Sequence, residues 1–273
     1  MPFDEIQQAW KTAIDDALNV DPDDANALGA KAMYLIGSTY DWKGALPLWS
    51  RSVGRSKLVA SLYPGGFLVL IGDWQGARQF YEAALINDPY NVDTLLDVAF
   101  SSHQQREYES ALKYWERILT ITPGMSYALA GKANTLALLG HPEEASRILE
   151  TIELRDLNPF GYIGFFQAAE IIGETPKYAD KLEAFRHLAI TDYRYRAPYA
   201  LTLPIYGNAD QAMAAQEQLF KEHNWGVLYL LHLSLVGPRY DTLRKKLNLD
   251  DQYLSELDAQ LKEIGPIAWG TSE

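Results

Sequence analysis

One pattern constrains the fold of this chain more than any other: a short turn-like segment ending in alanine returns about every 34 residues. The successive alanines lie 32, 34, 34 and 67 residues apart, and the last interval is close to twice 34. They are Ala45, Ala77, Ala111, Ala145 and Ala212. A fixed period of this length indicates a supersecondary unit stacked in series. The doubled interval predicts one degenerate repeat between Ala145 and Ala212.

The prolines form an independent series with the same period. Pro22, Pro89, Pro123 and Pro159 follow apolar runs and lie 67, 34 and 36 residues apart. Proline cannot continue a preceding helix, but it is tolerated in the first turn of the next one. These residues therefore mark points where one helix stops and another starts.

Between these markers the apolar residues have helical spacing. Ala111, Trp115 and Ile118 are separated by steps of four and three, and the segment 77–84 shows the same steps. Such steps place side chains on one face of a helix, whereas a strand would need alternation with a period of two. The sequence therefore predicts an all-α protein.

This unit resembles the tetratricopeptide repeat, in which Gly or a polar residue, an aromatic residue, Ala, a second aromatic residue and Pro recur at fixed positions. The resemblance covers residues 3 to about 222 and is strongest over 58–157. It implies a superhelical solenoid of antiparallel helix pairs. Within this array, residues 1–222, we expect the degenerate repeat at about 159–192.

The two ends need a separate interpretation. Phe3–Val20 has the pattern of a second helix without its first, so it is either a polar cap or the remainder of a repeat cut from a longer protein. Residues 223–273 are expected to form a helical cap continuous with the array. The Pro238–Tyr240 segment and the Leu-rich stretch after it resemble the tails of bacterial arrays attached to transcription-activator or cyclase-type signalling proteins.

Composition excludes several classes of partner and cofactor. The 273 residues include 24 Lys and Arg against 36 Asp and Glu, for a formal charge of −12, which argues against binding to nucleic acid or an anionic membrane. The chain has no cysteine, so disulfides, thiolate metal sites and thiol nucleophiles are absent. The longest uncharged runs, 15 and 14 residues, fall short of a membrane span. With no secretory signal pattern, we expect a cytoplasmic location.

Motifs for catalysis or metal binding are also missing. The chain has no phosphate-binding loop, dinucleotide fingerprint, zinc-protease helix or nucleophile elbow, and no two of its five histidines are three or four residues apart. We therefore expect no enzymatic activity, no catalytic residue, no metal and no cofactor.

The resemblance implies where a partner binds. In tetratricopeptide repeats, positions 2, 5, 9 and 12 of each first helix line a concave groove that receives a peptide. The candidate groove residues are Asp93, Phe100, His103, Tyr127, Asn134, Phe160, Gln167 and Glu170. The aromatic members are either anchors for a ligand or plain packing between repeats. Of the Lys and Asn pattern that clamps chaperone carboxylates, only Asn134 is present, which argues against that ligand.

A second candidate is an Arg- and Tyr-rich segment. Arg186, Arg194 and Arg196 form a possible anion patch in an otherwise acidic protein. Alternatively, the arginine stems and nearby tyrosine rings cover the core of the degenerate repeat.

These features favour a non-catalytic protein–protein interaction module that binds a peptide or partner domain in the groove. The alternative is a regulatory, sensor or self-association domain of a larger bacterial signalling or transcription-regulatory protein, and self-association would give a homodimer. The sequence leaves open the partner, the oligomeric state and whether the groove or the convex face binds.

Overall fold

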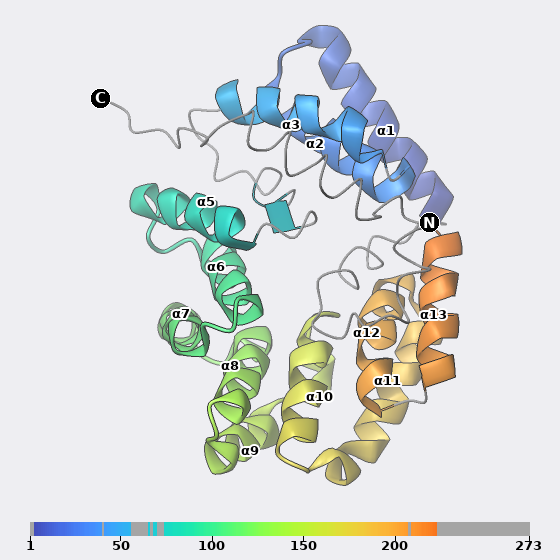
Figure 1. Ribbon diagram of the computed structural model, residues 1–273. Coiled ribbons are helices and arrows are strands. Elements are labelled where there is room, and N and C mark those ends of the chain that lie inside the picture. The colour runs from blue at the N-terminus through green and yellow to red at the C-terminus, as the bar shows by residue number, and fades with distance from the viewer. Residues whose placement is uncertain are drawn as a thin grey trace. The chain divides into compact units, whose positions relative to one another are not determined.

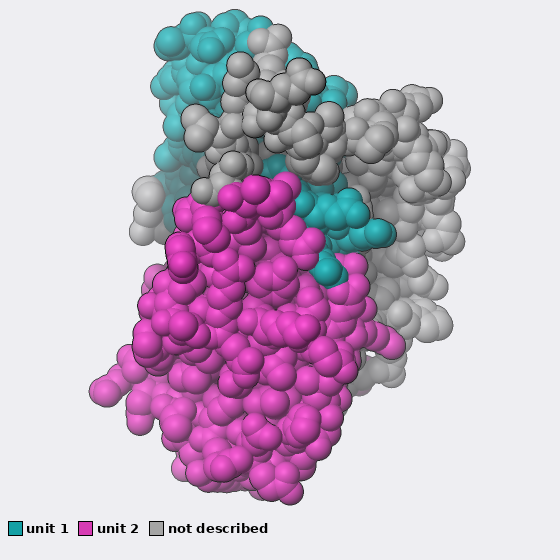
Figure 2. All heavy atoms as spheres, turned by 90° about the vertical axis from the view of Figure 1, so that its left-hand side faces the viewer, with its two compact units in different colours: residues 1–80, 223–273 teal, residues 81–222 magenta. Residues whose placement is uncertain are grey.

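The computed structural model describes residues 3–39, 41–55, 65, 68–69, 74–206 and 209–222 (Figure 1). These residues form helices and turns without a strand, so the all-α prediction is confirmed. The chain divides into two compact units, residues 1–80 with 223–273 and residues 81–222 (Figure 2). The predicted C-terminal cap, residues 223–273, lies outside the described residues.

In the first unit, α1 has the predicted bounds, Phe3–Val20. The helices that follow are α2 (Ala25–Tyr34), a π-helical turn (Leu35–Thr39) and α3 (Trp42–Arg55). The carboxylate of Asp24 accepts a hydrogen bond of 2.7 Å from the backbone N–H of Ala27, which caps the start of α2. Ala45 and Trp49 of α3 are fully buried, as expected for the inward face of a second helix.

The second unit is built from consecutive helix pairs. Helix α5 (Trp74–Asn87) crosses the boundary between the units. It is followed by α6 (Val92–Gln104), α7 (Tyr108–Ile121), α8 (Ser126–Leu138), α9 (Pro142–Thr151), α10 (Gly161–Ile171), α11 (Ala179–Thr191), α12 (Arg196–Tyr206) and α13 (Ala209–Lys221). Short 3₁₀ turns lie at Leu154–Asp156, Thr175–Tyr178 and Tyr193–Tyr195. The even-numbered helices from α6 are the first helices of each pair, so the degenerate repeat also forms a pair.

The turn between the two helices of each pair explains why a glycine or polar residue recurs before each second helix in the sequence. Arg106, Gly140 and Gly173 follow α6, α8 and α10, and each has a positive φ, between 63° and 82°. This left-handed residue lets the next backbone N–H reach back to a carbonyl five residues earlier, which ends the helix in a Schellman motif. The three bonds, of 2.8 to 3.0 Å, join Glu107 to Ser102, His141 to Leu136 and Glu174 to Ala169.

The predicted inward face of the second helices is confirmed. Ala111, Trp115 and Ile118 of α7 are all buried. The Trp115 ring lies directly on Gly131 of α8, because a Cβ atom added at Gly131 would lie 2.7 Å from two ring atoms. A Cβ atom at Gly164 of α10 would likewise lie 3.3 Å from the carbonyl oxygen of Ala130 in α8. The glycines therefore permit close helix packing.

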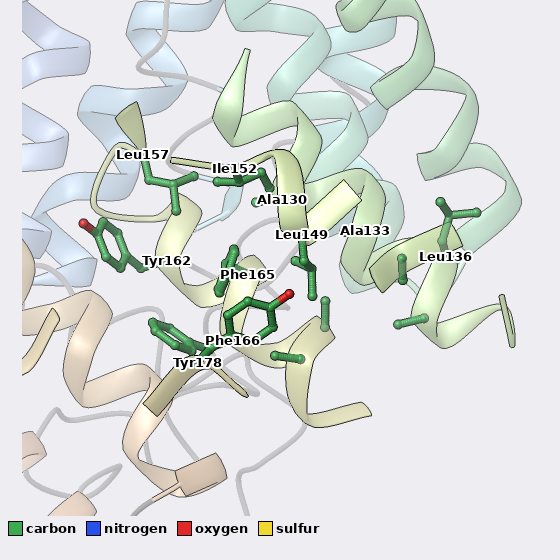
Figure 3. Close-up of a cluster of buried hydrophobic side chains, with 14 of the residues drawn as sticks. Ala130, Ala133, Leu136, Leu149, Ile152, Leu157, Tyr162, Phe165, Phe166 and Tyr178 are labelled. Carbon is green, nitrogen blue, oxygen red and sulfur yellow. The ribbon is translucent and has the colours of Figure 1, made fainter. Parts of the chain in front are cut away.

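The degenerate repeat is held by an aromatic core instead of the usual small–aromatic–small pattern (Figure 3). The rings of Tyr162 in α10 and Phe185 in α11 stack with centroids 4.2 Å apart, and Phe166 stacks on the same Phe185 ring at 5.8 Å. Leu182 and Leu188 of α11 pack against this core as partly buried residues. Aromatic area thus replaces the repeat signature where the sequence departs from it.

Candidate functional site

Hydrogen bonds join three candidate groove residues from three successive first helices. The side-chain amide nitrogen of Asn134, in α8, donates to Oε1 of Gln167, in α10, at 2.9 Å. The same nitrogen lies 3.4 Å from Nε2 of His103, in α6. We call His103, Asn134 and Gln167 the polar ladder. The structure thus brings together residues that are 31 and 33 positions apart in sequence.

The polar ladder is tied to the core through one threonine. The hydroxyl of Thr135 donates to the carbonyl oxygen of Gly131 at 2.8 Å, and its oxygen accepts from Nε1 of Trp115 at 3.1 Å. Nδ1 of His103 lies 3.2 Å from this oxygen. Because the threonine proton is already donated, we assign the histidine proton to Nδ1. Nε2 of His103 is then the acceptor that Asn134 requires.

The protonation state of His103 agrees with this assignment. Burial disfavours the charged imidazolium and lowers the pKa of His103 to about 4. The ring is therefore neutral near pH 7, with one donor and one acceptor nitrogen. The ladder needs this state, since a second ring proton would point at the amide hydrogens of Asn134.

One atom of the polar ladder has no partner. Asn134 is only 4% exposed, and its Oδ1 oxygen makes no hydrogen bond, whereas its amide nitrogen serves both neighbours. A buried acceptor without a donor costs free energy. The face of the first helices α6, α8 and α10 thus contains a hydrogen-bond acceptor that no described residue satisfies.

Asp97 is a functional candidate that the sequence reasoning missed. It is half-buried on α6, one helical turn after the exposed Asp93. Burial, followed by the charge of Asp93, raises the pKa of Asp97 to about 7, although a hydrogen bond from Tyr81 acts in the opposite direction. The i, i+4 spacing of two aspartates was the available signal, because such residues share a helix face.

The other candidate groove residues have varied surroundings. Tyr127 packs edge-on against Trp115, with ring centroids 6.1 Å apart, which favours the packing interpretation for this aromatic. Phe160 is the N-terminal flanking residue of α10 and is 38% exposed, and Phe100 is half-buried on α6. Glu170 is exposed near the end of α10 and accepts a hydrogen bond from the hydroxyl of Thr175.

The possible anion patch is internally neutralised. Arg186, Arg194 and Arg196 each bind a carboxylate within 3.0 Å. The carboxylates belong to Glu183, Asp192 and Glu222, respectively. Tyr195 and Tyr199 pack against the aromatic core. This arrangement favours the alternative interpretation, in which the segment covers the degenerate repeat, and the anion patch stays a prediction.

No group of three or more His, Asp or Glu side chains suited to a metal ion occurs within the described residues. In the same part of the chain, no helix has the length and apolar character needed to cross a membrane.

Comparison with known proteins identifies the repeat. The family model of the tetratricopeptide repeat matches residues 102–159, which run from the end of α6 to just past α9. Over these residues the chain is similar to the tetratricopeptide repeat. Repeats of this family generally mediate protein–protein interaction and are typically non-catalytic. Among curated proteins, none matches the chain.

Solved structures include a tetratricopeptide repeat protein similar to this chain. This protein comes from Parabacteroides merdae ATCC 43184, its structure was determined by crystallography, and it shares 20% sequence identity with this chain. The match covers 86% of this chain and 93% of that chain, with a TM-score of 0.40.

Proposed function

We propose that this chain is a non-catalytic interaction module that binds an extended or helical segment of a partner protein on the face of α6, α8 and α10. The polar ladder of His103, Asn134 and Gln167 carries this proposal. It joins three positions that line the ligand groove in related repeats, and it leaves one buried acceptor unsatisfied. A partner segment that lies across α6, α8 and α10 would find the three residues of the polar ladder together at one site.

The ladder is suited to this task because it is preorganised. Asn134 is fixed by two neighbours, and His103 is fixed through Thr135 to the indole of Trp115. Side chains that are already ordered lose little rotamer entropy on binding. Apolar contact area is also available at the C-terminal ends of the first helices, where Leu138 and Ile171 are exposed. Polar groups that fix orientation beside apolar area are typical of protein interfaces.

The test is selection of peptides from a random display library on the full chain. Affinities of the enriched peptides are then measured by fluorescence polarisation. We expect Gln167→Ala and Phe100→Ala to weaken binding by at least about tenfold, because each removes a contact group from this face. The matched control is Lys113→Ala, an exposed change on the second helix α7 that should leave affinity unchanged. Enriched peptides that bind all three variants like the wild type would exclude this face as the binding surface.

The molecular mass in solution distinguishes the regulatory or self-association alternative from the proposed interaction module. Ile190 is 61% exposed at the end of α11, and Tyr193, three residues later in the following 3₁₀ turn, is 39% exposed, so this edge offers apolar area to a second copy. Light scattering across a concentration series gives 30.7 kDa for a monomer. A stable dimer that Ile190→Asp dissociates would favour self-association.

A further inference from the structure

We propose that the helix pair α12 and α13 is a lid over the aromatic core of the degenerate repeat. The pair opens as one unit while α7 and α8 stay folded, and opening exposes the ring of Phe185 in α11. The lid is separate from the face proposed to bind a partner, because that face lies on α6, α8 and α10.

A buried amide in α13 weakens the closed pair. Gln216 is 0% exposed, and neither its amide nitrogen nor its amide oxygen has a hydrogen-bond partner. Water would satisfy both atoms once the pair opens, so their burial costs free energy only in the closed state. The two unpaired atoms therefore lower the free energy needed to open the pair.

The repeat pattern shows that Gln216 is exceptional. It lies four residues after the signature alanine Ala212. The residues four positions after the other signature alanines are aromatic or aliphatic, and all are buried: Trp49, Tyr81, Trp115 and Leu149. An amide at this position gives up the apolar burial that the other second helices gain there. We therefore expect α13 to be held less firmly than the second helices before it.

The backbone of α12 has a weak point as well. Pro204 lies inside this helix, and proline has no N–H group to donate. The carbonyl of Ala200, one turn earlier, therefore lacks the N–H that would bond to it in a regular helix. Closing the lid thus gains one backbone hydrogen bond fewer than a regular helix of this length would supply.

Contacts join α13 to the array through α12. Among the described helices, α13 packs extensively on α12 alone (Figure 1). A guanidinium nitrogen of Arg196, at the start of α12, lies 2.9 Å from Oε1 of Glu222, directly after α13. Each unit of a solenoid contacts only its neighbours, so loss of a terminal pair leaves the earlier pairs intact. The two helices can therefore open together.

Tyr199 of α12 closes over the aromatic core. Its ring meets the Phe185 ring edge-on, with centroids 5.3 Å apart, and Phe185 is 0% exposed in the closed structure. Phe185 also stacks on Tyr162 and Phe166 of α10, and it keeps these partners when α12 leaves. Opening thus uncovers an ordered aromatic surface.

Hydrogen exchange of the full chain under native conditions, measured by mass spectrometry on peptides that separate the helices, tests the lid. We expect the amides of α12 and α13 to share one opening free energy and to be protected at least about tenfold less than those of α7 and α8. Gln216→Met removes both unpaired atoms and keeps the length of the side chain. It should slow exchange in α12 and α13 by about tenfold and leave α7 and α8 unchanged.

Gln218→Met is the matched control, because Gln218 is an exposed glutamine of the same helix. It should change exchange by less than about threefold. Equal protection of α12, α13, α7 and α8 in the wild type would overturn the lid, and so would a lack of slowing by Gln216→Met. Slowing confined to α13 would overturn the opening of the pair as one unit.

Thiol labelling gives a second measurement, because the chain has no cysteine of its own. Ala200 of α12 is 1% exposed, and Ala133 of α8 is 0% exposed. A thiol reagent should modify Ala200→Cys at least about tenfold faster than Ala133→Cys, and adding Gln216→Met should slow only the first reaction. Equally slow labelling at both positions would mean that the pair does not open ahead of the array.

Discussion

The indole nitrogen of Trp115, on α7, donates a hydrogen bond of 3.1 Å to the hydroxyl oxygen of Thr135, on α8. Trp115 is the buried aromatic of the repeat signature, and Thr135 directly follows the ladder residue Asn134. Nδ1 of His103 approaches the same oxygen at 3.2 Å. One threonine hydroxyl therefore couples the core of a repeat to the polar groups of its proposed binding face.

Removing this hydroxyl should destabilise the fold. Thr135→Val keeps the shape and β-branching of the side chain but leaves the N–H groups of Trp115 and His103 without an acceptor. Buried donors that lose their partner cost about 1–3 kcal/mol. We expect a decrease of that size in the free energy of unfolding, measured by urea denaturation with tryptophan fluorescence.

Thr120→Val is the matched control for this prediction. Thr120 is an exposed residue of α7 whose hydroxyl donates to the carbonyl oxygen of Glu116 in the same helix. Its replacement should change stability by less than about 0.5 kcal/mol. Equal losses in the two variants would show that the Thr135 hydroxyl has no special role.

The packing of Trp115 on Gly131 leads to a second prediction. Alanine is favoured over glycine inside a helix by about 1 kcal/mol, so propensity alone predicts that Gly131→Ala is stabilising. In this structure the new methyl group would lie 2.7 Å from the indole, and the tryptophan is enclosed by the core. We expect a net loss of about 1–3 kcal/mol from overpacking.

A double-mutant cycle tests whether the indole causes this loss. Trp115→Phe removes part of the ring that meets the new methyl group. Gly131→Ala should therefore cost less when Trp115→Phe is already present, with a coupling energy of about 0.5 kcal/mol or more. Additive losses would place the strain elsewhere in α8.

The regular features of the fold were predictable because they depend on local spacing. The period of the alanines gave the inward face of α7, where Ala111, Trp115 and Ile118 are buried. The glycine or polar residue before each second helix marked the left-handed turn position, occupied here by Arg106 and Gly140. Such features follow from helical geometry and turn chemistry within one unit.

The polar ladder was predictable only in part. The resemblance selected His103, Asn134 and Gln167 individually, but their hydrogen bonds depend on how far one helix is shifted along the next. Asn134 and Gln167 both stand at position 9 of their helices and meet, whereas His103 stands at position 12, so the contact between α6 and α8 joins positions that are not equivalent. The period along the chain does not contain this shift. The burial of Asp97 depends on the same packing and was missed for the same reason.

The aromatic core of the degenerate repeat gives a third prediction. The Phe185 ring is fully buried and stacks on Tyr162 and Phe166. Phe185→Ala should destabilise the protein by about 3–5 kcal/mol, because it removes apolar area and leaves a cavity. Thermal unfolding followed by circular dichroism measures this loss.

A matched change on the same helix tests whether burial is the cause. Ile190 is 61% exposed in α11, so Ile190→Ala should cost less than about 0.5 kcal/mol. Phe185→Leu should lie between the two, since it keeps most of the volume but no ring. A mild effect of Phe185→Ala would mean that the aromatic core does not replace the missing repeat signature.

Asp97 and His103 are the two residues of α6 with shifted pKa values, and their contributions to stability should depend on pH in opposite directions. The pKa of Asp97 rises from 3.8 to about 7 on folding, so between these values the folded state holds a proton that the unfolded state lacks. The stability from Asp97 is therefore present at low pH and is lost as the pH rises toward about 7. The pKa of His103 falls from 6.5 to about 4, so the unfolded state holds the extra proton and stability rises over that range.

These opposite slopes should nearly cancel in the wild type between about pH 4 and pH 6.5, and single variants should reveal them. Asp97→Asn leaves the histidine contribution, so its free energy of unfolding should rise with pH by up to about 1.4 kcal/mol per unit relative to the wild type. His103→Gln leaves the aspartate contribution, so its stability should fall with a similar slope. Urea titrations at about pH 4.5 and about pH 6.5 measure both changes.

The double variant Asp97→Asn/His103→Gln provides the internal control, because it removes both groups and should return the profile to that of the wild type, whatever its absolute stability. Parallel profiles for the wild type and both single variants would contradict the shifted pKa values.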